Sequence, residues 1–196
     1  MKKIAVFCGA SIGFNPVYKW AAEQVGAYFA ECNIGLVYGG GKIGMMGAMA
    51  SKLLEHNGEV IGVIPHLLRD EEIIHSDVTK VIVTDTMSTR KVEMSKLVDG
   101  YIALAGGFGT LDEIFEVMTL GQLGIENKPI GILNTNNFFN PTLEQLDIMV
   151  REGFLKQENR EMILVANTID ELMKKMNNYQ APTLGKVIDT TVKKNS

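Results

Sequence analysis

The alternation of short apolar runs with longer amphipathic stretches constrains the fold of this chain more than any other feature. Residues 130–133, Ile-Gly-Ile-Leu, form one such run, and a segment with helical spacing of apolar residues follows it. Runs that are apolar throughout fit strands buried on both faces, as parallel sheets covered by crossover helices require. The pattern predicts an α/β fold, a doubly wound, Rossmann-like and mostly parallel sheet flanked by helices.

The same pattern predicts where the elements lie. Strands are expected at residues 4–8, 35–38, 60–64, 80–83, 101–104, 130–133 and 163–165. Helices are expected at residues 16–31, behind Asn15 as N-cap, and at 44–56, 86–98, 110–123, 142–152 and 168–178. Residues 1–178 are expected to form one domain, and the polar residues 179–196 a loosely attached tail.

Composition limits the classes of function. The 196 residues carry a formal net charge of -4, whereas a protein that holds a nucleic-acid backbone needs a surplus of Lys and Arg. Two cysteines favour reduced thiols over a disulfide framework. No run approaches the roughly 20 apolar residues of a membrane-spanning helix, and the first apolar run is interpreted as a strand rather than as a signal peptide. We therefore expect a cytoplasmic protein that binds neither nucleic acid polymers nor membranes.

Glycine-rich turns follow three of the predicted strands, at residues 9–13, 39–44 and 106–110. The carboxyl ends of parallel strands meet at one edge of the sheet, where such folds bind ligands. Glycine lets the backbone approach a phosphate closely, and a helix that begins after the turn offers free N–H groups and a positive dipole end. A single turn of this kind has an ordinary structural explanation. Three at one edge predict a phosphate ester site, with Ser11, Gly40 and Gly41 among its contacts.

The turns do not match the common nucleotide-binding motifs. Lys42 is followed by Ile43, whereas a triphosphate-binding loop requires a hydroxyl residue there. Gly9 and Gly13 lack the full spacing of a dinucleotide-binding turn. An ATPase or a hydride-transfer enzyme is therefore disfavoured.

Metal ligands, a serine nucleophile and a base-stacking platform are not indicated either. The sequence has no Gly-x-Ser-x-Gly element, and its three histidines are isolated from one another, at residues 56, 66 and 75. We expect no metal site. Trp20 and the methionines at 45, 46 and 49 are interpreted as packing residues.

Candidate catalytic residues lie near the third turn. Glu113 is expected in the first turn of the helix 110–123, where the dipole favours a carboxylate that faces a ligand held by the turn. For Asp112 and Glu116, ordinary helix-start acidity is the preferred explanation. Arg90 and Lys91 lie near the amino end of the helix 86–98, where the dipole disfavours cations. Either an anionic ligand or a salt bridge to an acidic helix should therefore compensate them.

Two motifs resemble those of the Lonely Guy family of phosphoribohydrolases, long mislabelled as lysine decarboxylases. Residues 106–113, Gly-Gly-Phe-Gly-Thr-Leu-Asp-Glu, resemble the family's Pro-Gly-Gly-x-Gly-Thr-x-x-Glu signature. Residues 90–94, Arg-Lys-Val-Glu-Met, resemble its Arg-Lys-x-x-Met element. Ala105 stands where the signature usually opens with proline, and Leu120 stands where a tryptophan is common.

The resemblance implies an enzyme that needs no cofactor. Such an enzyme hydrolyses the N-glycosidic bond of a nucleoside 5'-monophosphate, either AMP or an N6-modified AMP such as a cytokinin riboside 5'-monophosphate, to free base and ribose 5-phosphate. The resemblance also implies a homodimer with active sites near the subunit contact, and Arg90 and Glu113 as catalytic residues. The implied nucleotide-binding residues are Glu72, Arg90, Lys91, Gly107, Phe108, Gly109, Thr110, Leu111, Asp112, Glu113 and Thr119.

The residues fit this chemistry. Breaking an N-glycosidic bond builds positive charge on the ribose, and the Glu113 carboxylate can stabilise that charge and orient or deprotonate a water. Arg90 can pair with phosphate or ribose oxygens, or steady the departing base and the carboxylate. A nucleotide-binding or carrier protein of the same fold without turnover is the alternative. Pyridoxal-dependent decarboxylation has less support, since nothing around Lys42 or Lys91 resembles a Schiff-base site.

Overall fold

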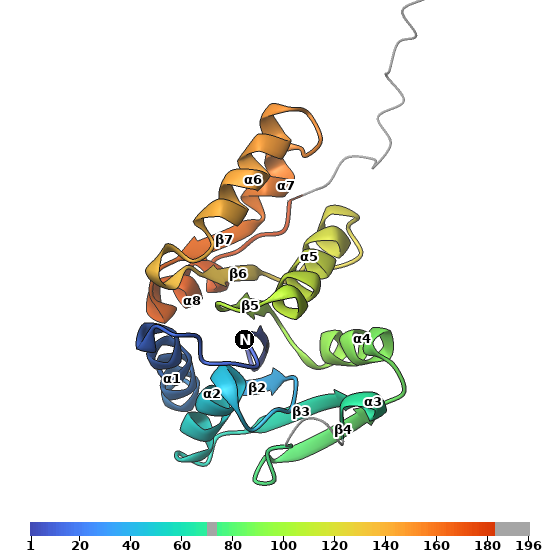
Figure 1. The fold of residues 1–196 in the computed structure, drawn as a ribbon. Coiled ribbons are helices and arrows are strands. Elements are labelled where there is room, and N and C mark those ends of the chain that lie inside the picture. Colours follow the sequence, from blue (N-terminus) through green and yellow to red (C-terminus); the bar gives the residue numbers. More distant parts are fainter. Residues whose placement is uncertain (70–73, 183–196) are drawn as a thin grey trace, which may run out of the picture.

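The computed structural model of the protein describes residues 1–69 and 74–182, in which the strands form one parallel sheet (Figure 1). The sheet has seven strands in the order β4-β3-β2-β1-β5-β6-β7. Each predicted strand is present, with both ends within one residue of the expected positions. The strands are β1 (Lys3–Phe7), β2 (Gly35–Tyr38), β3 (Val60–Pro65), β4 (Lys80–Thr84), β5 (Tyr101–Ala103), β6 (Ile130–Leu133) and β7 (Ile163–Ala166).

The predicted helices are confirmed, and three short elements are added to them. Asn15 caps the first helix as expected, because its Oδ1 accepts a hydrogen bond from the Val17 amide at 3.0 Å. The added elements, α3, η1 and α7, are too short to show a periodicity in the sequence. The helices are α1 (Pro16–Glu31), α2 (Gly44–Leu54), α3 (His66–Arg69), α4 (Met87–Leu97), α5 (Phe108–Gln122), the 3-10 helix η1 (Thr135–Asn137), α6 (Asn140–Arg151), α7 (Gln157–Glu161) and α8 (Ile169–Asn177).

Helices cover both faces of the sheet, which confirms the doubly wound α/β fold (Figure 1). One core cluster packs α1, α2 and α8 on one face, where Phe29 and Met49 meet the sheet. The other packs α4, α5 and α6 on the opposite face, where Met94 and Ile114 are fully buried. None of the helices in the described part of the chain is long and apolar enough to span a membrane.

The outcome for the expected packing residues is mixed. The three methionines of α2, at residues 45, 46 and 49, are buried as expected. Trp20 was expected to pack but is 58% exposed on the outer face of α1, so that prediction was wrong. Of the predicted polar tail, residues 183–196 lie outside the described residues.

The order of the strands brings the three glycine-rich turns together. The chain leaves β1 toward β2, β3 and β4 and returns to add β5 on the other side of β1, so the boundary between β1 and β5 is the topological switch point. The turns follow β2, β1 and β5, which are neighbours in the sheet. The Gly9 amide donates to the Ala105 carbonyl at 3.0 Å and ties the first turn to the segment that enters the third. The predicted convergence at one edge is therefore confirmed.

Candidate active site

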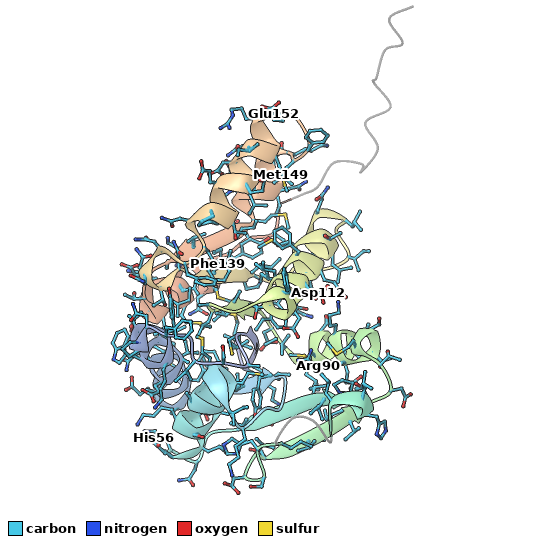
Figure 2. All side chains as sticks on the ribbon, viewed as in Figure 1. His56, Arg90, Asp112, Phe139, Met149 and Glu152 are labelled. Carbon is cyan, nitrogen blue, oxygen red and sulfur yellow. The ribbon has the colours of Figure 1, made fainter. Side chains whose placement is uncertain are left out.

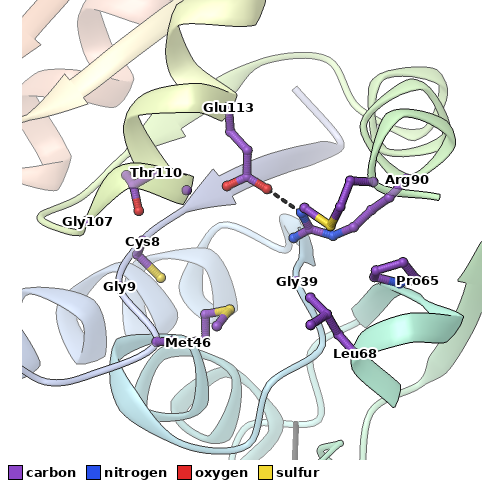
Figure 3. A pocket seen from close by; sticks show the side chains of 13 residues that line it. Cys8, Gly9, Gly39, Met46, Pro65, Leu68, Arg90, Gly107, Thr110 and Glu113 are labelled. Atoms are coloured by element: carbon purple, nitrogen blue, oxygen red, sulfur yellow. Dashed lines mark hydrogen bonds and ion pairs between the residues drawn. The ribbon is translucent and has the colours of Figure 1, made fainter. Parts of the chain in front are cut away.

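A cavity of about 290 Å³ opens at the switch point (Figure 3). Part of its wall comes from the first turn and the start of α5. Gly39 comes from the second turn. The end of β3 and α2, α3 and α4 add apolar side chains, and α4 also contributes Arg90. The cavity is lined by Cys8, Gly9, Ala10, Gly39, Met46, Pro65, Leu68, Met87, Arg90, Gly107, Gly109, Thr110 and Glu113.

Arg90 and Glu113 form a buried ion pair in this cavity (Figure 3). Arg90 Nη1 donates to Glu113 Oε1 at 2.5 Å, and the residues are only 8% and 7% exposed. Arg90 Nε also donates to the Val63 carbonyl at 2.9 Å, so the guanidinium is held on two sides. Burial raises the pKa of Glu113, while the charge of Arg90 and its hydrogen bond lower it in part. The salt bridge, one of the two explanations for the cations at the start of α4, is present in the structure.

The start of α4 is fixed by a capping box. The Thr86 side chain accepts from the Thr89 amide at 3.1 Å, and the Thr89 hydroxyl accepts from the Thr86 amide at 3.0 Å. The Arg90 side chain therefore projects from the amino-terminal part of a helix whose start is fixed by hydrogen bonds. Gly39 then gives the guanidinium its space, because a Cβ atom at residue 39 would lie 2.7 Å from Arg90 Nη2. The sequence approach did not single out Gly39, although it lies in the second glycine-rich turn.

The start of α5 differs from the expectation. The helix begins at Phe108 rather than at Thr110, so Glu113 lies in the second turn and not in the first. The helix dipole is therefore not what favours this carboxylate, and the ion pair with Arg90 takes that role. Gly107 is the N-cap and supplies no side-chain hydrogen bond, which leaves the first N–H groups of α5 for a ligand.

Three members of the third turn line the cavity. A Cβ atom at Gly107 or at Gly109 would meet no other atom within 4 Å, so the backbone at both residues faces open space. Thr110 is 3% exposed and lines the cavity beside them (Figure 3). Together with Arg90 and Glu113, these residues are the part of the predicted site that the fold brings together.

Cys8 is a wall residue that sequence reasoning did not assign to the site. Its thiol is buried, and burial together with the nearby Glu113 charge raises its pKa well above the usual range. The thiol is therefore neutral at physiological pH and unsuited to nucleophilic attack. Met46, Pro65, Leu68 and Met87 were also not assigned, and they carried no signal beyond apolar character.

Lys91 and Asp112 face a different part of the molecule. Lys91 Nζ lies 3.0 Å from Asp112 Oδ2 and also pairs with Glu116, so three charges link α4 to α5 outside the cavity. Figure 2 shows Arg90 and Asp112 on these neighbouring helices. Lys91 and Glu116 line a second space of about 270 Å³ between the two helices, on the other side of Glu113. The described geometry therefore gives Lys91 a role in holding α4 against α5.

The other predicted contacts are dispersed. Ser11 lines an adjoining cavity, whereas Gly40 and Gly41 are buried, and Gly39 takes their place in the wall. Phe108 is 94% exposed at the start of α5. Leu111 packs against the core. Thr119 is exposed, and its hydroxyl donates to the Phe115 carbonyl at 2.8 Å. Glu72 lies outside the described residues.

The chain is similar in sequence to a known protein family over most of its length. A family model described as "Possible lysine decarboxylase" matches residues 46–176. The cytokinin riboside 5'-monophosphate phosphoribohydrolase LOG1 of Arabidopsis thaliana is 44% identical over 178 residues, which cover 91% of this chain and 84% of that protein. The chain belongs to the Lonely Guy family. A second member, the probable cytokinin riboside 5'-monophosphate phosphoribohydrolase LOGL2 of Oryza sativa subsp. japonica, is 42% identical over 189 residues, or 95% of this chain and 76% of that protein. The resemblance carried by the two motifs is thus confirmed.

Solved structures show the same fold at lower identity. The molybdenum cofactor binding protein from Rippkaea orientalis superposes with a TM-score of 0.68 at 20% identity, covering 90% of this chain and 96% of that one. The Moco carrier protein from Chlamydomonas reinhardtii gives a TM-score of 0.67 at 20% identity, covering 90% and 95%. At this identity the likeness concerns the fold alone.

Within residues 1–69 and 74–182 no group of three or more His, Cys, Asp or Glu side chains could hold a metal ion.

Proposed function

We propose that this protein hydrolyses the N-glycosidic bond of a nucleoside 5'-monophosphate, AMP or an N6-modified AMP such as a cytokinin riboside 5'-monophosphate, to the free base and ribose 5-phosphate. The observation that carries the proposal is the buried Arg90–Glu113 pair, which shares its cavity with the uncapped start of α5. Relatives at 42% to 44% identity carry names that specify this reaction. A carrier without turnover would not require a buried carboxylate and guanidinium in the wall of its cavity.

The two ends of the cavity suit the two ends of the substrate. The N–H groups at the start of α5, around Gly107 and Gly109, suit the 5'-phosphate, because free backbone donors and the helix dipole both favour an anion there. The apolar wall formed by Met46, Leu68 and Met87 suits a flat base. The ribose would then lie beside Glu113, between the two.

Glu113 is the proposed catalytic group. As C–N cleavage proceeds, positive charge builds on the ribose ring, and a fixed carboxylate stabilises it more in the transition state than in the ground state. The same carboxylate can orient a water for attack on the anomeric carbon. Arg90, held by the Val63 carbonyl, fixes the position of the carboxylate and offsets the increase in its pKa that burial causes.

The decisive experiment compares substrates that differ in one group. Purified protein is incubated with AMP, with an N6-alkyl AMP and with adenosine, and free base and ribose 5-phosphate are quantified. We expect turnover of the monophosphates with little action on adenosine, because the N–H groups at the start of α5 bind the substrate through its phosphate. A Glu113→Gln variant prepared in parallel controls for contaminating nucleosidases. Equal turnover of AMP and adenosine would contradict the assignment of the phosphate to the third turn.

We further propose that the protein acts as a cytoplasmic homodimer. Thr119 is exposed on α5 and lies apart from the cavity of its own chain, and Leu123 and Ile125, at and just after the end of the same helix, are 42% and 69% exposed. A second copy packed over this end of α5 would cover these apolar groups. Sedimentation equilibrium of the full chain tests this, and a strictly monomeric protein with full activity would refute it.

A further inference from the structure

A second cavity adjoins the catalytic one across the first glycine-rich turn. It measures about 540 Å³ and is bounded by residues 9–13, by Tyr18 of α1, by Met45 of α2 and by Phe138 after η1. Gly9, Ala10 and Gly107 line both cavities. The two spaces are therefore separated by the first glycine-rich turn and by Gly107, the N-cap of α5 at which we propose that the phosphate lies.

The lining of the second cavity is neutral. Among the described residues that form it, none is an Asp, Glu, Lys or Arg, and most are apolar or glycine. Phe138 and Tyr18 meet edge to face with ring centroids 5.7 Å apart, and Phe138 remains 39% exposed. An aromatic surface without a countercharge binds a neutral, flat or apolar group, whereas a second free phosphate would find no cation there.

Position and chemistry together indicate one occupant. A phosphate at the start of α5 would have its nucleoside in the catalytic cavity and its remaining oxygens toward the second cavity, since Gly107 borders both. A group esterified to one of those oxygens would enter the neutral space beside Phe138. The catalytic cavity measures about 290 Å³, whereas the neutral space beside Phe138 measures about 540 Å³.

We infer that the second cavity is a subsite for a neutral aromatic or apolar group esterified to the 5'-phosphate, so that the ligands of this protein include nucleoside 5'-phosphodiesters. The inference rests on the proposed function, because it takes the phosphate position from it. Phe138 is the residue that discriminates in favour of the ester, and it has no contact with the catalytic cavity.

The test uses adenosine 5'-phenylphosphate as an inhibitor of ribose 5-phosphate release from AMP, a signal that the ester itself does not produce. The wild-type protein is expected to bind the ester at least as tightly as AMP. Phe138→Ala should weaken the ester roughly 10-fold, the loss that follows removal of one aromatic stacking partner, and leave the KM for AMP within about twofold. Phe154→Ala, which truncates a phenylalanine that is 84% exposed outside both cavities, is the matched control and should change neither value.

The outcomes separate the inference from the function on which it rests. If AMP is hydrolysed but the ester binds more than about 10-fold more weakly than AMP, the inference is wrong and the proposed function stands. The same holds if Phe138→Ala weakens AMP and the ester equally, because Phe138 would then act on the fold rather than on the subsite. If AMP is neither bound nor hydrolysed, the proposed function itself fails and the inference fails with it.

Discussion

Replacing Gly39 with alanine should disable the enzyme without unfolding it. A Cβ atom at this position would lie 2.7 Å from Arg90 Nη2 and 3.0 Å from Met46 Sδ, whereas ordinary contact begins at 3.4 Å. The Met46 side chain is flexible and can give way, but the guanidinium is held by the Val63 carbonyl and by Glu113. The guanidinium must therefore move by about 0.7 Å, which lengthens the 2.5 Å hydrogen bond to Glu113 or breaks it.

The size of the effect follows from the geometry of catalysis. A misplacement of about 1 Å at a catalytic group costs on the order of 100-fold in rate, so kcat for AMP should fall by roughly 10-fold to 100-fold in Gly39→Ala. The acid limb of the pH profile of kcat should also move to higher pH, because Arg90 lowers the pKa of Glu113 and a displaced guanidinium lowers it less. Initial rates of adenine release between pH 5 and pH 8 measure both quantities.

Gly121→Ala provides a matched control. Its Cβ would lie 2.6 Å from Met162 Cε, a comparable crowding on α5 that involves no residue of the cavity. This variant should stay folded, because Met162 Cε is the end of a flexible side chain, and it should show normal kcat and a normal pH profile. If Gly39→Ala instead keeps wild-type activity while folded, or loses activity without a shift of the acid limb, the reasoning that Gly39 positions Arg90 is refuted.

Three further predictions concern the charge, the turn and a buried histidine. Glu113→Gln should lower the rate of base release by at least about 100-fold with AMP affinity within a few-fold, and retention of most activity would move the catalytic assignment elsewhere. The Cβ of Gly109→Ala would meet no protein atom within 4 Å, so this variant should keep its melting temperature. Its KM for AMP should rise at least roughly tenfold, because the methyl group displaces the phosphate from the backbone donors. An unchanged KM would show that the phosphate does not bind at this turn. Burial lowers the pKa of His75 below its ordinary 6.5, an effect that Lys42 increases and Asp77 partly offsets, so stability in urea should fall as pH drops below 6.5, and less so in His75→Gln. An equal pH dependence of the two proteins would exclude His75 as the cause.

The fold was predictable because its strands are short, apolar and buried on both faces. The run Ile130-Gly131-Ile132-Leu133 shows this, since the pattern placed a strand there and all four residues are buried in β6. The short helix α7 (Gln157–Glu161) was not predictable, because five residues are too few to show a 3.6-residue period. Trp20 was misplaced for a related reason. Size and hydrophobicity favour burial, but the face of α1 that carries Trp20 is decided by packing against α2.

The fold brings together the residues that backbone chemistry and the motifs singled out, whereas features that depend on packing were not visible in the sequence. The three turns were found because glycine signals close approach, and Glu113 was found through its place in the motif. Gly39 was missed because its role is to leave space for an arginine that is distant in sequence, a relation that only the fold reveals. The family resemblance implied nucleotide binding for both Arg90 and Lys91. Successive residues of a helix point about 100° apart, so Arg90 lines the cavity while Lys91 pairs with Asp112 on α5.

The ion pairs that Arg90 and Lys91 form between α4 and α5 differ in what they can do. A buried pair must recover a large desolvation cost, so the Arg90–Glu113 pair, at 8% and 7% exposure, is weak as a stabilising device and would be replaceable by apolar residues if packing were its purpose. The Lys91–Asp112 pair, with Asp112 exposed, has a smaller desolvation cost and can link the helices without serving chemistry. The inner pair instead places a carboxylate of raised pKa and a fixed cation in the wall of a cavity. A reaction that develops charge would explain a charged pair in that position, and this supports our proposal that the inner pair is catalytic while the outer one links the helices.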